Sequence, residues 1–285
     1  MEVIDGGVNM TTPPRHYLLA SDFDQTLSFN DSGHVLSELL GVRGFEDKVS
    51  GLARSNLVQQ GGELAYLIRH DPDFRGVRRD HLTETGRRVR LKSGLPALVD
   101  FLERGLDGFQ FSFCVVSAAP REVVVAALDG IVSPERIFGT EFDYDPSSGE
   151  VRSIQRVPAG YGKVAVLEEL AQRLGVVSDR IIYVGDGSSD VHVMLHVNNG
   201  DGFTIALSEN RQLARIAKTT VLSDSTFSIL VPVLDQVIGM RTGQIRKLIE
   251  SSGMMLHDWE SARTDRVRIL EVPPVAVALP AMGAA

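Results

Sequence analysis

Short apolar runs alternate along the chain with segments of helical periodicity. The runs are short and bounded by polar turns, as is typical of parallel strands buried on both faces, and they lie at residues 17–21, 111–116, 180–184, 203–207 and 219–222. Helical spacing and helix start and stop signals occupy the segments between several of them, at residues 94–105, 121–128, 162–174 and 212–217. This alternation predicts an α/β fold with a doubly wound parallel sheet.

A different pattern fills the chain from about residue 31 to residue 92. Its apolar residues follow helical spacing, as at Val35, Leu36 and Leu39, and no β-branched strand run interrupts them. We therefore expect a small helical domain inserted after the first strand of the sheet. The predicted division is a helical insert at residues 30–91 and an α/β core at residues 1–29 and 92–285, of which residues 240–285 form a C-terminal helix and tail.

Composition and charge narrow the classes of partner. The 285 residues are 43% hydrophobic and 23% charged, which predicts a soluble globular protein with a sizeable core. A net charge of -8 argues against nucleic acid and against an anionic membrane surface as partners. No apolar run reaches the roughly 18 residues of a membrane-spanning helix. The single cysteine, Cys114, fits a reducing compartment, so we expect a cytoplasmic protein.

The first candidate site follows the strand predicted at residues 17–21. Asp22 and Asp24 lie two positions apart at its C-terminal end, the edge of an α/β sheet at which ligands bind. In an extended segment their side chains point the same way, close enough to share a divalent cation or to divide the roles of nucleophile and acid/base. An ordinary Asx turn uses aspartate just as readily, so the pair alone favours neither interpretation.

A second acidic turn, Gly-Asp-Gly-Ser-Ser-Asp at residues 185–190, follows another apolar strand. Asp186 and Asp190 offer the hard oxygen ligands that Mg²⁺ prefers, and Gly185 and Gly187 let the backbone approach an ion closely. The spacing does not fit an EF-hand loop, because no glutamate stands at its twelfth position. A plain glycine turn is the alternative.

Two further polar side chains stand where a phosphate group could bind. Ser117 follows the strand at residues 111–116, with Ala118 beside it, and Lys163 lies at the start of a predicted helix. Free backbone N–H groups at a helix start bind anions, and a lysine there opposes the helix dipole and favours an anionic partner. Taken singly, such a serine is more often a helix cap and such a lysine is merely solvated.

The ordered set of Asp-x-Asp-x-Thr, Ser, Lys and Gly-Asp-Gly-x-x-Asp resembles the motifs of the haloacid dehalogenase superfamily of aspartate-nucleophile phosphohydrolases. It is most similar to the phosphoserine phosphatase-type branch, and the match extends from about Leu18 to Val221. The helical insert is similar in position to that family's mobile cap, which closes over the substrate. The resemblance implies a capped, Mg²⁺-dependent phosphatase that hydrolyses a small phosphorylated metabolite through a phosphoaspartate.

The resemblance also implies a role for each motif residue. Asp22 matches the nucleophile, and Asp24 matches the acid/base that protonates the leaving oxygen and then activates water. Asp190 matches a residue that either assists the metal ion or orients Lys163. On the substrate side, the matching residues are Thr26, Ser117, Ala118 and Lys163. At the Mg²⁺ site they are Asp22, Asp24 (through its backbone carbonyl), Asp186 and Asp190.

Departures from the family pattern leave the substrate open. Asp31 stands about where phosphoserine phosphatases have a glutamate that helps to hold the amino acid, and Ser189 stands where an asparagine is common. No arginine of the insert matches the family's cap arginine. Phosphoserine is therefore one candidate among small phosphomonoesters. A phosphotransferase or phosphomutase of the same superfamily, or a non-catalytic binder of a phosphorylated metabolite, is the alternative function.

Two other features have simpler interpretations. His192 and His196 lie one helical turn apart, a spacing that can bind zinc, but no third ligand is evident. Cys114 lies inside an apolar strand, where a thiol is far more often packing than a nucleophile.

Overall fold

The computed structural model describes residues 13–55, 57–208 and 210–254. The chain divides into two units between Ile245 and Arg246, and the elements that build the sheet belong to the first. The predicted tail residues beyond 254 and the first twelve residues lie outside the described part. None of the described helices is long and apolar enough to cross a membrane.

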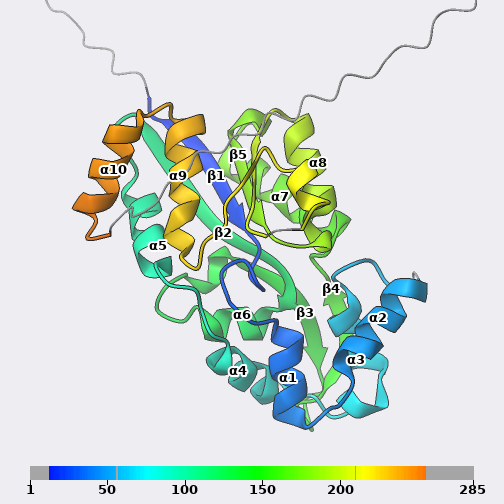
Figure 1. Cartoon of the computed structure of the whole chain (residues 1–285). Helices are drawn as coiled ribbons and strands as arrows, with labels where there is room; N and C mark the ends of the chain where they lie inside the picture. The colour runs from blue at the N-terminus through cyan, green and yellow to red at the C-terminus, as the bar shows by residue number, and fades with distance from the viewer. Residues whose placement is uncertain (1–12, 56, 209, 255–285) are drawn as a thin grey trace, which may run out of the picture. The chain divides into compact units, whose positions relative to one another are not determined.

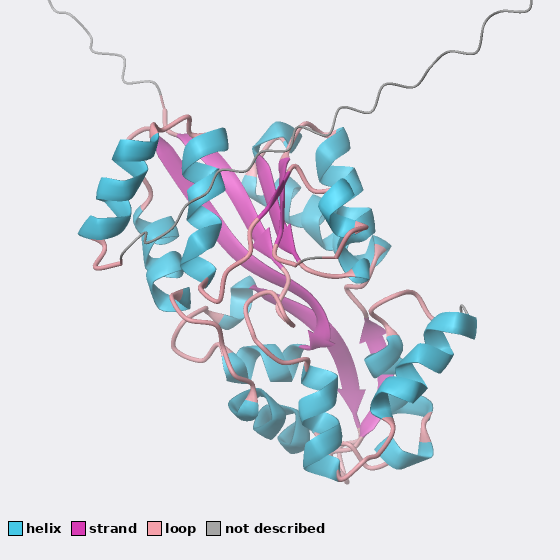
Figure 2. Cartoon of the chain, viewed as in Figure 1, coloured by secondary structure: helices cyan, strands magenta, loops and turns pink. Residues whose placement is uncertain are grey.

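Within the described residues, seven strands form one sheet (Figures 1 and 2). The strands are β1 (Arg15–Ser21), β2 (Phe109–Pro120), β3 (Ile137–Tyr144), β4 (Val151–Arg156), β5 (Ile181–Gly185), β6 (Phe203–Ala206) and β7 (Thr219–Thr220). Their order is β4-β3-β2-β1-β5-β6-β7, and every neighbouring pair is parallel except the hairpin β3-β4. The predicted parallel α/β sheet is confirmed.

Helices cover both faces of this sheet. The core helices are α5 (Leu95–Arg104), α6 (Arg121–Ala127), α7 (Tyr161–Leu174) and α8 (Val191–Asn199). Connections between parallel strands are right-handed, so α5 and α6, on the path from β1 to β3, cover the face opposite to α7 and α8 (Figure 1). The path leaves β1 in one direction and returns on its other side at β5, which makes the β1–β5 boundary a topological switch point.

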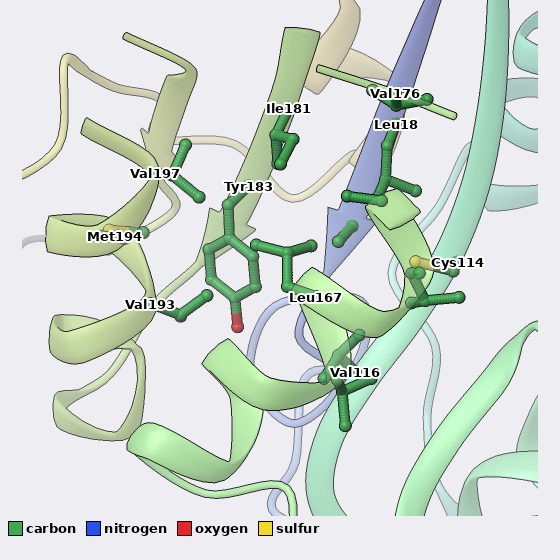
Figure 3. Close-up of a cluster of buried hydrophobic side chains, with 14 of the residues drawn as sticks. Leu18, Cys114, Val116, Leu167, Val176, Ile181, Tyr183, Val193, Met194 and Val197 are labelled. Carbon is green, nitrogen blue, oxygen red and sulfur yellow. The ribbon is translucent and has the colours of Figure 1, made fainter. Parts of the chain in front are cut away.

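A buried apolar cluster packs α7 and α8 against the strands (Figure 3). It includes Leu18, Cys114, Leu167, Tyr183 and Met194. Burial raises the pKa of the Cys114 thiol to about 12, so the thiol is protonated at neutral pH. This supports the interpretation of Cys114 as packing. Because the cluster fixes both helices on the strands, the starts of α7 and α8 are held at the edge where β1 and β5 end.

The segment between β1 and α5 is helical, as the periodicity predicts. It contains α1 (Ser32–Leu40), α2 (Phe45–Ser55), α3 (Glu63–His70) and α4 (Arg79–Arg88). The chain enters and leaves it side by side: the Phe29 N–H donates to the Arg90 carbonyl at 2.8 Å, and the Lys92 N–H donates to the Leu27 carbonyl at 2.9 Å. The division into a core and a separate insert domain stays a prediction.

Several elements differ from the predicted ones. β2 continues to Pro120 because its end pairs with β3, after a shift of register beyond Val116. Residues 212–217 contain only a 3₁₀ turn, Leu213–Arg215, since so short a segment cannot repay the cost of nucleating an α-helix. α10 (Thr242–Ser251) lies where the C-terminal helix is predicted. Before it the chain also contains α9 (Leu230–Pro232) and a π-helical turn (Val233–Val237).

Candidate active site

Three strands that carry the motif residues end at the same edge of the sheet. β1 lies between β2 and β5 and is parallel to both. The Asp22 N–H donates to the Val184 carbonyl at 2.9 Å and so prolongs the pairing of β1 and β5 by one residue. This arrangement brings Asp22 to the turn that begins with Asp186, at the switch point of the sheet.

A tight turn follows Asp22. The Phe23 carbonyl accepts hydrogen bonds from the N–H groups of the next residues at positions 26, 27 and 28, at 3.2, 2.8 and 3.1 Å. Gln25 has a φ of 57°, a left-handed conformation that is uncommon for a residue other than glycine. The Lys92 ammonium donates to the Gln25 carbonyl at 2.6 Å and holds this turn in place. The spacing of the acid pair suggested an extended segment. The hydrogen bonds show that the segment is instead curled into a turn.

The turn directs Asp24 to the start of α1. Its carboxylate oxygens accept hydrogen bonds from the Ser32 N–H at 3.0 Å and the Ser32 hydroxyl at 2.5 Å. Burial raises the pKa of Asp24 well above its usual value, and the nearby charge of Asp31 raises it further, although the Ser32 bonds oppose this. The raised pKa favours the protonated form of Asp24, which is the form that a general acid uses. No sequence motif indicates this role of Ser32.

Lys163 is fully buried in the first turn of α7 and lies between two carboxylates. Its Nζ is 2.8 Å from Asp22 Oδ2 and 2.6 Å from Asp190 Oδ1. Burial lowers the pKa of this ammonium, but the charges of Asp190 and Asp22 outweigh burial and raise the pKa above its usual value. The side chain therefore stays charged while it is shielded from water, which strengthens its attraction for an anion.

Asp190 is surrounded by donors. Its Oδ1 accepts from Lys163 and, at 2.7 Å, from the hydroxyl of Tyr183. Its Oδ2 accepts from the N–H groups of Asp186 and Gly187, at 3.1 and 3.0 Å. Four donors match the number of lone-pair positions that two carboxylate oxygens offer. Of the two roles that the sequence left open for Asp190, this geometry favours orienting Lys163.

Asp22, Asp186 and Asp190 each offer a carboxylate oxygen within 4.8 Å of the others. Burial raises the pKa of Asp22 to about 6, although Lys163 opposes it, and burial together with the charges of Asp22 and Asp190 raises the pKa of Asp186 to about 7. Crowded carboxylates of this kind fit a hard divalent cation, whose charge relieves their repulsion. The carboxylate of Asp24 does not belong to this group among the described residues.

The remaining predicted residues hold the site together. The Thr26 hydroxyl donates to Asp186 Oδ1 at 2.6 Å, so it orients the acidic turn. Ser117 is buried inside β2 and accepts from the Ala119 N–H at 3.2 Å, and Thr140 of β3 holds the Ala118 carbonyl at 2.7 Å. Because β2 continues to Pro120, Ser117 is not the cap of α6.

The two histidines of α8 face α7. The His192 ring stacks on Tyr161 with 4.2 Å between ring centroids, and His196 Nε2 is 3.6 Å from Glu168 Oε1. Neither histidine belongs to a group of metal-type ligands in the described part of the chain. The zinc interpretation has no support here.

Comparisons with known proteins identify the family and the fold of the chain. The family model described as haloacid dehalogenase-like hydrolase matches residues 19–195, more than half of the chain. No match is found among curated proteins.

Solved structures share the fold. A substrate-bound phosphoserine phosphatase complex is 18% identical, with a TM-score of 0.60 over 76% of this chain and 97% of that one. A phospho-aspartyl intermediate analogue of phosphoserine phosphatase has the same identity, TM-score and share of this chain, and 98% of its own length is covered. A phosphoserine phosphohydrolase-like protein from Francisella tularensis is 17% identical, with a TM-score of 0.58 over 75% of this chain and 99% of that one. The fold is that of the phosphoserine phosphatase-type structures, and the chain belongs to the haloacid dehalogenase-like hydrolase family.

Proposed function

We propose that the protein is a Mg²⁺-dependent phosphomonoesterase that acts on a small phosphorylated metabolite through a phosphoaspartate at Asp22. One observation carries this proposal. The buried Asp22 carboxylate lies 2.8 Å from the fully buried ammonium of Lys163 and beside Asp186, so a nucleophile and a fixed positive charge meet at one point. Phosphoryl transfer depends chiefly on such positioning and charge neutralisation.

In the first step, an Asp22 oxygen forms a bond to phosphorus as the bond between phosphorus and the leaving oxygen breaks. The protonated carboxyl of Asp24 gives its proton to that oxygen, and the alcohol departs. The raised pKa of Asp24 suits it for this role. Lys163 neutralises charge on the transferred group from the side of α7.

In the second step, water attacks the phosphorus of the phosphoaspartate, and the bond between phosphorus and Asp22 breaks. Asp24, now ionised, takes the proton of the attacking water and is ready for the next cycle. Inorganic phosphate is released and the Asp22 carboxylate is restored. The Ser32 bonds keep Asp24 oriented in both steps.

Asp22 and Asp186 are the carboxylates that we assign to the metal ion, together with the backbone carbonyl of Asp24. A bound Mg²⁺ supplies positive charge to the phosphate oxygens. We assign Asp190 to Lys163 rather than to the ion, because its oxygens already accept four hydrogen bonds.

The role of Asp31 bears on how narrowly the substrate can be proposed. Its Oδ1 caps α1 by accepting from the N–H groups of Gly33 and His34, at 2.8 and 3.2 Å. This capping role differs from the amino-acid-binding role of the family's glutamate. We therefore propose a small phosphomonoester without restricting it to phosphoserine. The helical insert at residues 30–91 would act as the cap over the substrate. The cytoplasmic location of the protein stays a prediction.

Asp22→Asn tests the nucleophile. The change keeps the shape of the side chain and removes its charge, so we expect turnover of a generic aryl phosphate with Mg²⁺ to fall by more than about a thousandfold. Asp179→Asn, at an exposed position, is the matched control and should leave the rate unchanged. An Asp22→Asn protein that is folded and retains its rate would remove the assignment.

A further inference from the structure

The loop between α2 and α3 lies on the segments that carry the motifs. We refer to residues 57–62 as the cap loop. Gly61 in this loop has a φ of 92°, and a β-carbon added there would lie 2.9 Å from the Cβ of Ser189, 3.2 Å from that of Ala159 and 3.4 Å from that of Ala118. In the sequence, Ser189 precedes Asp190 and Ala118 follows Ser117. Ala159 lies four residues before Lys163. The cap loop therefore contacts sequence neighbours of three motif residues: Asp190, Lys163 and Ser117.

Gln59 of the cap loop binds the backbone at the start of α7. With its amide oriented to suit both partners, its oxygen accepts from the Tyr161 N–H at 2.7 Å and its nitrogen donates to the Ala159 carbonyl at 3.2 Å. The contact is close, because a β-carbon at Gly160 would lie 2.1 Å from the Gln59 amide atom that is the oxygen in this orientation. A larger residue at position 160 would have to displace this amide, and the φ of 51° at Gly160 also favours glycine.

Helix α7 has no side-chain cap of its own. Gly160 stands at its N-cap position and has no side chain to accept a hydrogen bond. The first N–H groups of a helix need acceptors from outside the helix. Gln59 provides one of them from a distant part of the chain, two residues before Lys163.

The cap loop is held in shape by its own hydrogen bonds. The Gly62 N–H donates to the Gln59 carbonyl at 2.8 Å, and the Gly61 N–H donates to Glu63 Oε2 at 2.7 Å. Glu63 is itself buried at the start of α3. The turn is thus preorganised, and Gln59 does not need to reorder the loop in order to reach α7.

We infer that Gln59 is a positioning residue that fastens the cap loop to the start of α7 and so holds Lys163 and the neighbouring motif turns in their closed arrangement. This inference rests on the proposed function. Gln59 does not touch the reacting atoms. Its amide satisfies the Tyr161 N–H and the Ala159 carbonyl while the loop is seated, and water takes its place when the loop lifts.

The test compares Gln59→Ala with Gln60→Ala, a matched control at the adjacent, exposed position. Gln59→Ala should raise KM for an aryl phosphate about fivefold and leave kcat within about twofold, since a fivefold loss corresponds to about 1 kcal/mol, the usual contribution of one N-cap. Gln59→Glu keeps the acceptor for Tyr161 and loses the donor to Ala159, so it should lie between wild type and Gln59→Ala. Gln60→Ala should match wild type in both constants.

A second measurement does not depend on turnover. Amide hydrogen exchange at Tyr161, followed with Mg²⁺ and beryllofluoride as a phosphoryl mimic, should slow in wild type and stay about fivefold faster in Gln59→Ala. Equal exchange and equal KM in Gln59→Ala and wild type would overturn the inference. If wild type hydrolyses no phosphate ester, the proposed function fails, whereas exchange at Tyr161 without added ligand still decides whether Gln59 protects that amide.

Discussion

At the scale of single residues, the site is a chain of contacts that ends on one ammonium group. Lys163 is placed by Asp190, and Asp190 is placed by Tyr183 and by two backbone N–H groups of its own turn. All of these donors point at the Asp190 carboxylate, and its charge is a main cause of the raised pKa of Lys163. A buried charge of this kind is tolerated only because its partners are complete.

Tyr183→Phe removes only the hydroxyl that donates to Asp190. Tyr183 is fully buried, and its hydroxyl donates to a carboxylate, so we expect the free energy of unfolding to fall by about 1.5–3 kcal/mol in urea denaturation. Tyr17→Phe is a matched control, since the Tyr17 hydroxyl has no hydrogen bond to the described residues. An equal loss in both variants would show that the Tyr183 hydroxyl contributes no more than an ordinary phenol.

The acids of this site can be predicted from the sequence more readily than the residues that hold them in place. Asp22, Asp24, Asp186 and Asp190 stand in compact patterns after apolar strands, and those patterns can be read locally. The residues that hold these groups are brought into contact by tertiary packing or by the curl of a turn, and no local sequence pattern marks them. They are Ser32 for Asp24, Tyr183 for Asp190, Lys92 for Gln25 and Gln59 for Tyr161.

At the scale of elements, α4 of the insert packs directly on α6 of the core. A β-carbon at Gly86 would lie 2.2 Å from the Val123 carbonyl oxygen and 2.8 Å from the Cβ of Ala126. The two helices therefore approach through the bare backbone of a glycine. This crossing ties the last helix of the insert to the helix that follows β2, the strand that contains Ser117.

Gly86→Ala should destabilise the protein because the new methyl group meets backbone. We expect a loss of about 1–3 kcal/mol in the free energy of unfolding, the usual cost of overpacking. Gly51→Ala is the matched control: Gly51 lies in α2 with nothing within 4 Å of an added β-carbon, so alanine should stabilise by up to about 1 kcal/mol. The same sign of change in both variants would contradict this account of the crossing.

Burial explains which elements the sequence predicts. β1 and β5 are buried almost throughout on both faces, so they appear as apolar runs. β4 is intermediate or exposed along its whole length and carries no such run, so it is not among the predicted strands. The long end of β2 was missed because pairing with β3, rather than hydrophobicity, extends it.

At the scale of the whole molecule, the clustered carboxylates of the active site lower the free energy of unfolding when they are ionised. The protein carries a net charge of -8, and the site gathers three carboxylates around one ammonium. Burial raises the pKa of Asp22 to about 6 and that of Asp186 to about 7, both above the value of roughly 3.9 for aspartate in an unfolded chain. The metal-free folded protein therefore binds more protons than the unfolded chain.

The sign of the pH dependence follows from these raised values. Where a folded-state pKa is raised, the group's contribution to stability is fully present below the unfolded pKa and is lost as pH rises through the folded pKa. We therefore expect the free energy of unfolding of the metal-free protein to fall as the pH rises from about 4 to about 7, because Asp22 and Asp186 lose their protons over this range. Mg²⁺ binds the ionised carboxylates and displaces their protons, so its stabilising effect should grow over the same range.

Thermal unfolding with and without Mg²⁺ checks this. Near pH 8, Mg²⁺ at about 100 times its Kd should stabilise the fold by about 2.7 kcal/mol, and the same concentration should stabilise it much less near pH 5, where protons compete for the carboxylates. Asp186→Asn should remove most of the Mg²⁺ effect, whereas Asp179→Asn should preserve it. A Mg²⁺ effect of equal size at both pH values would show that the ion binds without displacing protons, and the assignment of Asp22 and Asp186 as its ligands would fail.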